Sequence, residues 1–406
     1  MSADLPDTCD TWPSTLQAAR MRLAAVRPAE YARSRNHLDG AVTRLSPYVT
    51  HGFLHLPEVL AAVVARHRLD LNHKFVQELG WRAYFHHVWH HEGERIFVSL
   101  HDGVLPDDAY ARALPRDLRE GATGVPVIDT AVRTLYATGW LHNHVRMWLA
   151  SYVVHLRKVH WRAGADWLFA HLIDGDLASN HLSWQWVAGT GSHKPYLFNA
   201  DNVARYAPPG SPWLSPGSVI DTSYETLDQL ARQGAPVPGP GGEGIAEPSW
   251  RKRPPDDLFD PLDPACVEGR TVWLMHPWAL GPVPDDLPPD TLCLGWWPAP
   301  FHSRWPWSER RWRFVGDRLR AVCEAVWWVD AQGLAVALAR ARRVDGWADP
   351  HLGPVPWPLR APPSLFGEPG RRCRSFSQFW QQVTRGLDGL DELPGLIDAR
   401  RQAELF

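Results

Sequence analysis

Residues 174–186 read Asp174-Gly-Asp-Leu-Ala-Ser-Asn-His-Leu-Ser-Trp-Gln-Trp186, and this stretch decides the fold. A short turn with two acids leads into a predicted helix over 177–188. Helical spacing puts Asp176, Asn180 and Trp184 on one face, because residues four apart share a face. That face offers an anion, an amide and a large ring, which suits a flat redox-active ligand beside an electron donor. A buried helix whose polar residues cap and whose Trp packs also explains the stretch taken alone.

Composition narrows the class of protein. The 406 residues are 45% hydrophobic, so two or three domains with a sizeable core are expected. A net charge of −3 excludes the broad basic surface of a nucleic-acid binder, and any such contact has to use a local patch. Five scattered cysteines without a CxxC pattern argue against a disulfide framework, a zinc site or an iron–sulfur cluster. With no signal peptide and no membrane-spanning run, we expect a cytoplasmic protein.

Hydrophobic periodicity predicts a helical first half and a mixed second half. Helices are expected over 15–25, 47–50, 56–68, 72–91, 126–138, 141–157, 163–172 and 177–188. Further on, strands over 271–278, 291–297 and 325–330 alternate with helices over 308–324 and 333–343, which predicts a small parallel sheet. The expected divisions are a helical domain over 1–206, a Pro/Gly-rich linker over 207–270 with one helix near 222–233, an α/β domain over 271–385 and a C-terminal tail over 386–406.

A second polar stripe lies on the predicted helix over 72–91. Glu78, Trp81 and Arg82 stand at i, i+3 and i+4, and so present an acceptor, a stacking plate and a cation together. This combination suits a flipped nucleobase with its flanking phosphate. A half-buried Trp between charged neighbours is the alternative interpretation.

Two further groups have the chemistry to contact a ligand. Ser46 is predicted to cap a helix that Pro47 opens, and the Thr43 and Ser46 hydroxyls could hold a phosphate or serve only as caps. Arg146 could pair with Asp174 and present a fixed donor–acceptor edge to a heterocycle, although a structural salt bridge explains that pair too.

Four histidines on the helix over 72–91 raise the question of a metal. His86/His90 and His87/His91 are each four residues apart, but no Glu is placed as in a zinc protease helix, and no other ligand cluster is evident. We expect solvated or packed histidines and no metal site.

The ordered set of motifs from Tyr31 to Asn199 resembles the FAD-binding half of the DNA photolyase/cryptochrome family. The motifs are Thr43-Arg-Leu-Ser-Pro-Tyr48, Glu78-Leu-Gly-Trp-Arg82, Gly121-Ala-Thr-Gly-Val-Pro-Val-Ile-Asp129, Thr138-Gly-Trp-Leu-His-Asn143, Trp161-Arg162, Asp174 to Trp186, and Tyr196-Leu-Phe-Asn199. Each is weak alone, but the ordered set is specific. The resemblance implies a mainly α fold: a helical FAD-binding domain followed by a smaller α/β domain. Residues 271–385 resemble the family's antenna domain in a shifted position, with an unrelated α/β module as the alternative.

The resemblance also implies roles for individual residues. The FAD phosphates would be held by Tyr31, Thr43, Leu45 and Ser46. The flavin and ribose would be surrounded by Trp140, Asn143, Arg146, Asp174, Asp176 and Asn180, with Asn180 at flavin N5. The pocket for a pyrimidine dimer would comprise Glu78, Trp81, Arg82, Asn143, Met147 and Trp186. The residues expected to take part in the chemistry are Glu78, Asn180, Trp184 and Trp161, the last two as inner members of an electron relay.

Two departures from the family pattern stand out. The family's outer relay Trp belongs near residues 105–120, where this chain has none, and the candidate substitutes are Trp148, Trp167 and Trp89. Of the basic residues that grip DNA in the family, Arg35 and Arg82 are retained, His144 replaces another, and Lys194 lies near the position of a missing one. DNA affinity is therefore in doubt.

The function implied by the resemblance is light-driven repair of cyclobutane pyrimidine dimers, as in a deoxyribodipyrimidine photo-lyase. FAD is the expected cofactor and damaged DNA the expected partner, with a second chromophore whose identity the sequence does not give. No membrane or metal partner is expected. The alternatives are a cryptochrome-like blue-light photoreceptor, which would use the same flavin without repair, and a flavoprotein that binds another substrate in the same cavity.

Overall fold

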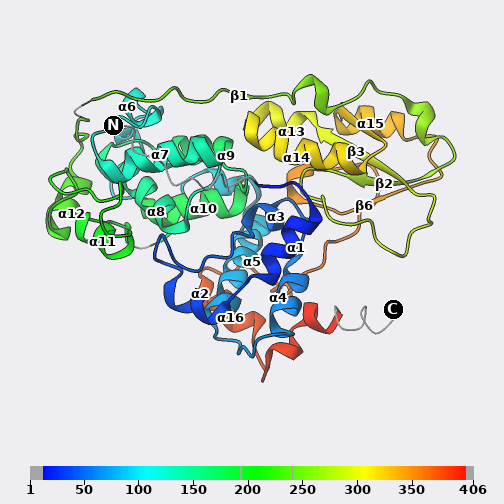
Figure 1. The fold of residues 1–406 in the computed structure, drawn as a ribbon, viewed down its shortest axis with the longest axis horizontal. Helices are drawn as coiled ribbons and strands as arrows, with labels where there is room; N and C mark the ends of the chain where they lie inside the picture. The colour runs from blue at the N-terminus through cyan, green and yellow to red at the C-terminus, as the bar shows by residue number, and fades with distance from the viewer. Residues whose placement is uncertain (1–11, 193, 240, 399–406) are drawn as a thin grey trace.

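The computed structural model describes residues 12–192, 194–239 and 241–398. The start of the predicted helical domain (1–11) and the end of the predicted tail (399–406) lie outside the described residues. Three lobes meet near the centre of the molecule (Figure 1). One holds helices α6 to α12, one holds the sheet, and one holds α1 to α5 with the C-terminal helix α16. Along the described chain, no helix is both long and apolar enough to cross a membrane.

The helices of the first half follow the predicted periodicity closely. They are α1 (Leu16–Ala24), α2 (Pro28–Ser34), α3 (Ser46–Thr50), α4 (Leu56–Val64), α5 (Lys74–Glu92), α6 (Arg116–Arg119), α7 (Pro126–Thr138), α8 (Asn143–Ser151), α9 (Trp161–His171), α10 (Leu177–Ala188), α11 (Ala200–Tyr206) and α12 (Tyr224–Arg232). The prediction missed α2 and α11, which are only two turns long, and α6, which is a single turn. The helix predicted over 141–157 begins at Asn143, because His142 accepts a hydrogen bond from the His144 N–H as its cap, and it continues into a π-helical turn at Tyr152–Leu156.

The second half contains the predicted parallel sheet. Its strands are β2 (Thr271–Met275), β3 (Leu292–Pro298), β5 (Ala325–Val329) and β6 (Arg343–Gly346), ordered β5-β3-β2-β6 and all parallel. Helices α13 (Ala299–Arg304), α14 (Glu309–Val322) and α15 (Ala331–Ala337) connect or cover them. The prediction of a helix over 333–343 was wrong at its C-terminal end. The observed helix ends at Ala337, and Arg343 begins an edge strand paired with Thr271. The mainly α fold with a smaller parallel α/β part is confirmed.

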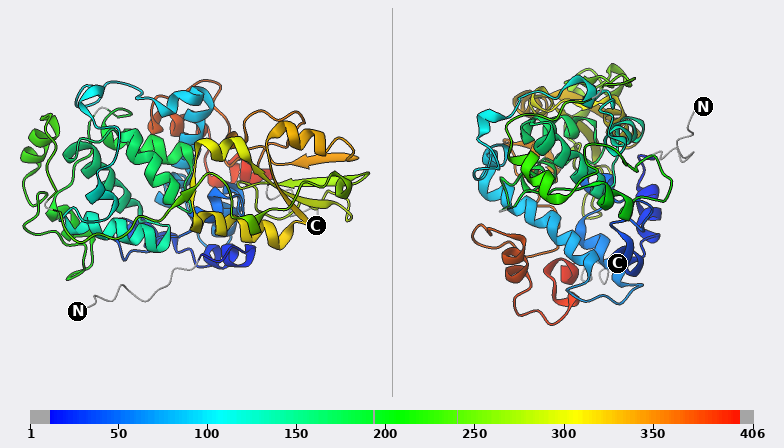
Figure 2. Two further views of the ribbon diagram at one scale, coloured as in Figure 1. Left: turned by 90° about the horizontal axis from the view of Figure 1, so that it is seen from above. Right: turned by 90° about the vertical axis from the view of Figure 1, so that its left-hand side faces the viewer.

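The predicted linker contributes to the packed structure. Its β1 (Trp250–Arg251) pairs antiparallel with β4 (Trp307–Ser308). The chain end then returns to the first half, where α16 (Phe376–Val383) packs on α5 and a Cβ on Gly80 would meet the Trp380 ring at 2.5 Å. Figure 2 shows the molecule from two further sides, with the red C-terminal end of the described chain near the blue helices, where a Cβ on Gly395 would lie 2.9 Å from Pro57.

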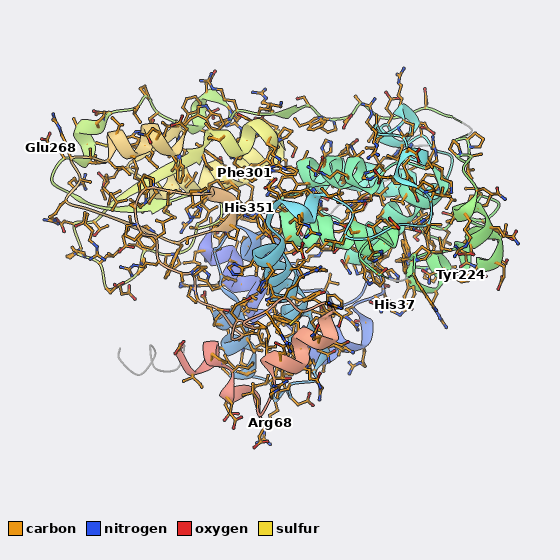
Figure 3. The ribbon with its side chains drawn as sticks, turned by 180° about the vertical axis from the view of Figure 1, so that it is seen from behind. His37, Arg68, Tyr224, Glu268, Phe301 and His351 are labelled. Carbon is orange, nitrogen blue, oxygen red and sulfur yellow. The ribbon has the colours of Figure 1, made fainter. Side chains whose placement is uncertain are left out.

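Aromatic rings join the sheet lobe to the lobe of the first helices. His351 stacks on Trp278 with ring centroids 4.4 Å apart and meets Trp89 of α5 edge-on at 4.8 Å. Phe301 and His351 lie at this junction (Figure 3). A single buried cluster runs from the early helices into the sheet lobe, so the α/β part is built against the helices. The division into domains at the predicted boundaries stays a prediction.

Candidate functional site

A cavity of about 300 Å³ lies between α5, α8 and the turn from α9 into α10. Its volume is at the lower end of the range for small-molecule sites, about 300–1,000 Å³. The side chains that line it include Glu78, Trp81, Asn143, Arg146, Met147, Asp174, Asp176, Asn180, Trp184 and Trp186. The α10 stripe is thus complete, whereas Arg82 of the α5 stripe does not line the cavity and pairs with Asp176 instead. Residues from four separate elements thus face one space.

The predicted Arg146–Asp174 pair is confirmed. Arg146 Nη2 donates to both carboxylate oxygens of Asp174, at 3.0 and 2.7 Å, and Arg146 Nε donates to the Leu141 carbonyl at 2.9 Å. The Asp174 side chain is 1% exposed and that of Arg146 is 24% exposed. Because both groups line the cavity, they form a rigid edge with a donor and an acceptor side by side.

Asp176 starts α10 and carries a fixed negative charge. Its Oδ1 accepts from the Ser179 N–H at 2.7 Å as the helix cap, and its Oδ2 lies 3.0 Å from His86 Nε2 and 3.4 Å from Arg82 Nη2. Burial alone would raise the pKa of Asp176, but His86 and Arg82 together hold this pKa well below its usual range. The sequence analysis did not assign a role to His86, which reaches Asp176 from another helix.

Asn180 and Trp184 continue the stripe along α10. Asn180 Nδ2 donates to the Ala165 carbonyl at 2.8 Å, which fixes the amide plane against α9 and directs its carbonyl oxygen to accept from a ligand. Trp184 is buried against α9, where a Cβ on Gly164 would lie 2.3 Å from the ring. Ser179 Oγ also lines the cavity, is buried, and has no hydrogen-bond partner among the described residues. An unpaired buried hydroxyl suits a cavity that takes a polar ligand.

Indole rings border the cavity. Trp81 stacks face to face on Phe376 of α16, with ring centroids 4.1 Å apart and planes 8° apart. Phe376 is not among the cavity-lining residues, so it supports the Trp81 ring from outside. Trp186 is 39% exposed and lies against Tyr196. Asn143 and Met147 face the same space from α8, with Asn143 Nδ2 4.0 Å from Met147 Sδ.

Glu78 is tied to an arginine that was expected to face DNA. Arg35 Nε lies 3.3 Å from Glu78 Oε1, and the two side chains are 24% and 38% exposed. Burial raises the pKa of Glu78, and Arg35 opposes this rise. Since Arg82 is likewise engaged with Asp176, both retained arginines already have internal acidic partners. His144, at the position of a third, donates from Nδ1 to the Asn36 carbonyl at 2.9 Å.

The residues expected around phosphates do not line this cavity. Ser46 was predicted to cap α3, but the helix has no side-chain cap, and Ser46 Oγ instead accepts from Trp140 Nε1 at 3.2 Å. The cap prediction was wrong because the chain enters α3 with helical dihedrals already at Leu45. Thr43 Oγ1 accepts from the Leu45 N–H at 3.4 Å. Tyr31 packs edge-on against Phe75. Trp140, expected at the flavin or ribose, does not line the cavity either, and the roles of these five residues stay predictions.

The expected relay residues are both buried, with Trp184 at the cavity and Trp161 away from it. Trp161 Nε1 donates to Ser99 Oγ at 2.9 Å, and Trp161 lines a second cavity of about 900 Å³. Among the described residues, the recorded ring neighbours of Trp161 are His160 and His181 rather than the three candidate substitutes. Tyr110, in the segment that lacks the outer Trp, has its ring 6.3 Å from His160. A search for any oxidisable aromatic residue in 105–120 would have found it.

One residue of the sheet lobe holds the turn that carries both acids. Arg311 of α14 is fully buried and donates from Nη2 to the Gly175 carbonyl at 2.5 Å and from Nη1 to the Phe169 carbonyl at 3.2 Å. A Cβ on Gly175 would lie 2.5 Å from Arg311 Nη1, so glycine is required between Asp174 and Asp176. No local pattern pointed to Arg311, because its partners lie far away in the sequence.

The histidines of α5 are hydrogen-bonded and packed. His87 Nε2 accepts from the Cys373 N–H at 2.9 Å, and His87 Nδ1 lies 2.5 Å from Glu368 Oε1. The possible ligand atoms of His87, His91 and Glu368 lie within 4.8 Å of one another, and sequence spacing had not indicated Glu368. Since Nε2 is an acceptor, Nδ1 carries the proton and donates to Glu368. The expected absence of a metal stays a prediction.

Residues 75–209 match the family described as the FAD binding domain of DNA photolyase. A deoxyribodipyrimidine photo-lyase of Synechococcus sp. is 30% identical over 265 residues, covering 59% of this chain and 52% of that protein. Cryptochrome-1 of Arabidopsis thaliana is 28% identical over 233 residues, covering 48% of this chain and 34% of that protein. A solved Synechocystis sp. cryptochrome has a TM-score of 0.44 at 26% identity, over 55% of this chain and 52% of that chain. The chain spans about half, or less, of the length of these curated relatives.

Proposed function

We propose, from the premise that the helical part of this chain belongs to the DNA photolyase/cryptochrome family and takes FAD as its cofactor, that the chain repairs cyclobutane pyrimidine dimers in DNA under light. The isoalloxazine would bind in the cavity between α5, α8 and α10. The dimer would enter the same cavity between Trp81 and Trp186. When bound in its reduced form, the flavin supplies a light-activated electron to the substrate.

The polar groups of the cavity suit a flavin ring. The Arg146–Asp174 edge would pair with the ring's carbonyl and N–H groups, and Asn180 offers a neutral oxygen to an N–H. Asp176 would add a negative charge that stays ionised, since its pKa is held low. Ser179 Oγ would find in the ligand the partner that the described protein atoms do not offer. The donor set therefore fits the cofactor.

The indole rings and Glu78 suit a dimer taken out of the duplex. Extrusion costs a few kcal/mol, and stacking on an aromatic ring contributes ~1–3 kcal/mol per base. Stacking on Trp81 and Trp186 would therefore offset the cost. Glu78 lines the cavity and would hydrogen bond to the polar edge of the lesion. Phe376 would keep Trp81 in place when the site is empty.

One observation carries the proposal: a single cavity is lined at once by the acids and amide of α10 and by Glu78, Trp81, Met147 and Trp186. The test is to illuminate the reduced, flavin-loaded protein with an oligonucleotide that contains one thymine dimer, and to follow the recovery of thymine. We expect recovery that depends on light and on Trp81. No recovery under full reduction would sink the repair proposal while leaving flavin binding untouched.

The second candidate is a photoreceptor that does not repair DNA, and the ion pairs of Arg35 and Arg82 favour it. Arg35 and Arg82 are each only 24% exposed and already pair with acids, so little basic surface faces a DNA backbone near the cavity. The two functions separate in a binding assay at low salt, because phosphate contacts dominate DNA affinity. Equal and weak binding of damaged and undamaged duplexes would favour the photoreceptor.

A further inference from the structure

Three sulfur atoms converge in the sheet lobe, outside the proposed flavin cavity. Met275 ends β2, Cys293 lies on β3, and Cys323 follows α14. Cys293 Sγ is 3.3 Å and Cys323 Sγ is 3.7 Å from Met275 Sδ. Both thiols therefore contact the same thioether sulfur. The three residues come from segments 18 and 48 residues apart, so no sequence motif announces the cluster.

The donor set of this cluster is soft. Thiolate and thioether sulfurs prefer Cu(I) and similar ions, whereas Mg²⁺, Ca²⁺ and Mn²⁺ prefer oxygen ligands. Two thiolates around a monovalent ion leave one net negative charge. The charge of Arg318 acts on both thiols, and this side chain is anchored by a hydrogen bond from Nε to the Leu280 carbonyl at 3.0 Å. Its guanidinium would balance that charge.

The thiolate is the form of cysteine that binds a metal, so binding of the ion would displace the thiol protons.

The cluster is small enough for an ion and reachable from outside. Cys293 and Cys323 are half-buried, whereas Met275 is 1% exposed and closes the inner side. A metal–sulfur distance of about 2.3 Å places the sulfurs of a trigonal site about 4 Å apart. The two separations that involve Met275 Sδ, 3.3 and 3.7 Å, are therefore about 0.7 and 0.3 Å shorter than such a site needs.

We propose that Met275, Cys293 and Cys323 form a binding site for a soft monovalent metal ion, Cu(I), in the sheet lobe. The site is independent of the flavin cavity. It joins β2, β3 and the end of α14, so bound metal would also stabilise that lobe.

The experiment is an anaerobic titration of the reduced full-length protein with Cu(I) in competition with a coloured Cu(I) chelator. Mass spectrometry first checks that Cys293 and Cys323 are free thiols. We expect one equivalent to bind. Cys293→Ser and Cys323→Ser should each lose it, and Met275→Leu, which conserves volume, should weaken it about tenfold or more. Cys266→Ser is the matched control, since this half-exposed cysteine lies elsewhere on the lobe.

Ag(I) serves as a redox-inert second probe, read out as a rise in the thermal unfolding temperature. Wild type and Cys266→Ser should rise equally, and Cys293→Ser should not. If Cys293→Ser and Cys323→Ser keep the wild-type stoichiometry and thermal shift, the proposal is overturned. Unchanged affinity in Met275→Leu would overturn the three-sulfur site as well.

Discussion

Arg311→Met should loosen the turn that carries Asp174 and Asp176, although Arg311 belongs to α14 of the sheet lobe. Arg311 donates to the Phe169 and Gly175 carbonyls, and its guanidinium lies 3.9 Å from the Trp307 ring centroid. Each hydrogen bond from a charged donor contributes ~1.5–3 kcal/mol. Met keeps the aliphatic contacts but leaves two buried carbonyls without their donor. We expect the free energy of unfolding to fall by about 3–5 kcal/mol.

The same change should lower flavin content beyond the loss of stability. Gly175 is fixed by Arg311 and lies between the acids that hold Arg146 and Arg82. A mobile turn would no longer hold the Arg146–Asp174 edge in place. The ratio of flavin to protein absorbance after purification measures this effect, and urea unfolding followed by Trp fluorescence measures the stability.

Arg313→Met is the matched control on the same helix. The Arg313 side chain is 40% exposed and pairs with Asp257 and Glu309 at the surface, so its loss should cost less than about 1 kcal/mol and leave flavin bound. If Arg311→Met unfolds no earlier than Arg313→Met and retains as much flavin, the role assigned to Arg311 is wrong.

Four further outcomes follow from the site and the core. Asp174→Ala should purify with little flavin because Arg146 loses its partner; a fully loaded variant would contradict this. Trp81→Ala should keep its flavin but repair about 5- to 150-fold more slowly, from the ~1–3 kcal/mol of stacking, and unchanged repair rates would exclude the stacking role. Gly164→Ala should displace the Trp184 ring, which lies 2.3 Å from the added Cβ, and slow the photoreduction of oxidised flavin relative to wild type. Burial lowers the pKa of His155 to about 4 in the folded protein, whereas its pKa in the unfolded chain is 6.5. Below pH 6.5 the unfolded chain therefore binds the proton first, and the free energy of unfolding falls as the pH drops towards 4. Between pH 8 and pH 5 the loss is ~2 kcal/mol, and His155→Gln should remove that part of the pH dependence in urea titrations.

Local chemistry made much of the helical half predictable. Long periodic stretches gave α5, α7 and α10 close to their observed ends, and Gly139 and Gly189 end two of these helices in the left-handed region. Errors fell where periodicity had few residues to act on, as in the two-turn α2 and α11. Arg343 was assigned to a helix because its strand exists only through pairing with β2.

The candidate site was likewise predictable within single helices and not between them. The stripes on α5 and α10 were visible because residues three or four apart share a face. That the two stripes face one cavity depends on how α5, α8 and α10 pack. Arg35 was expected to be free for DNA, yet it pairs with Glu78 across 43 residues.

The sequence by itself determined which faces of α5, α8 and α10 carry polar and aromatic side chains, since the helical repeat is a local property. Tertiary structure alone decided what those faces meet: Arg311 under the acidic turn, Phe376 behind Trp81, and three sulfurs gathered in the sheet lobe. Arg311 and Gly175 are 136 residues apart, and contacts over such separations arise from the packing of elements and leave no periodic trace along the chain.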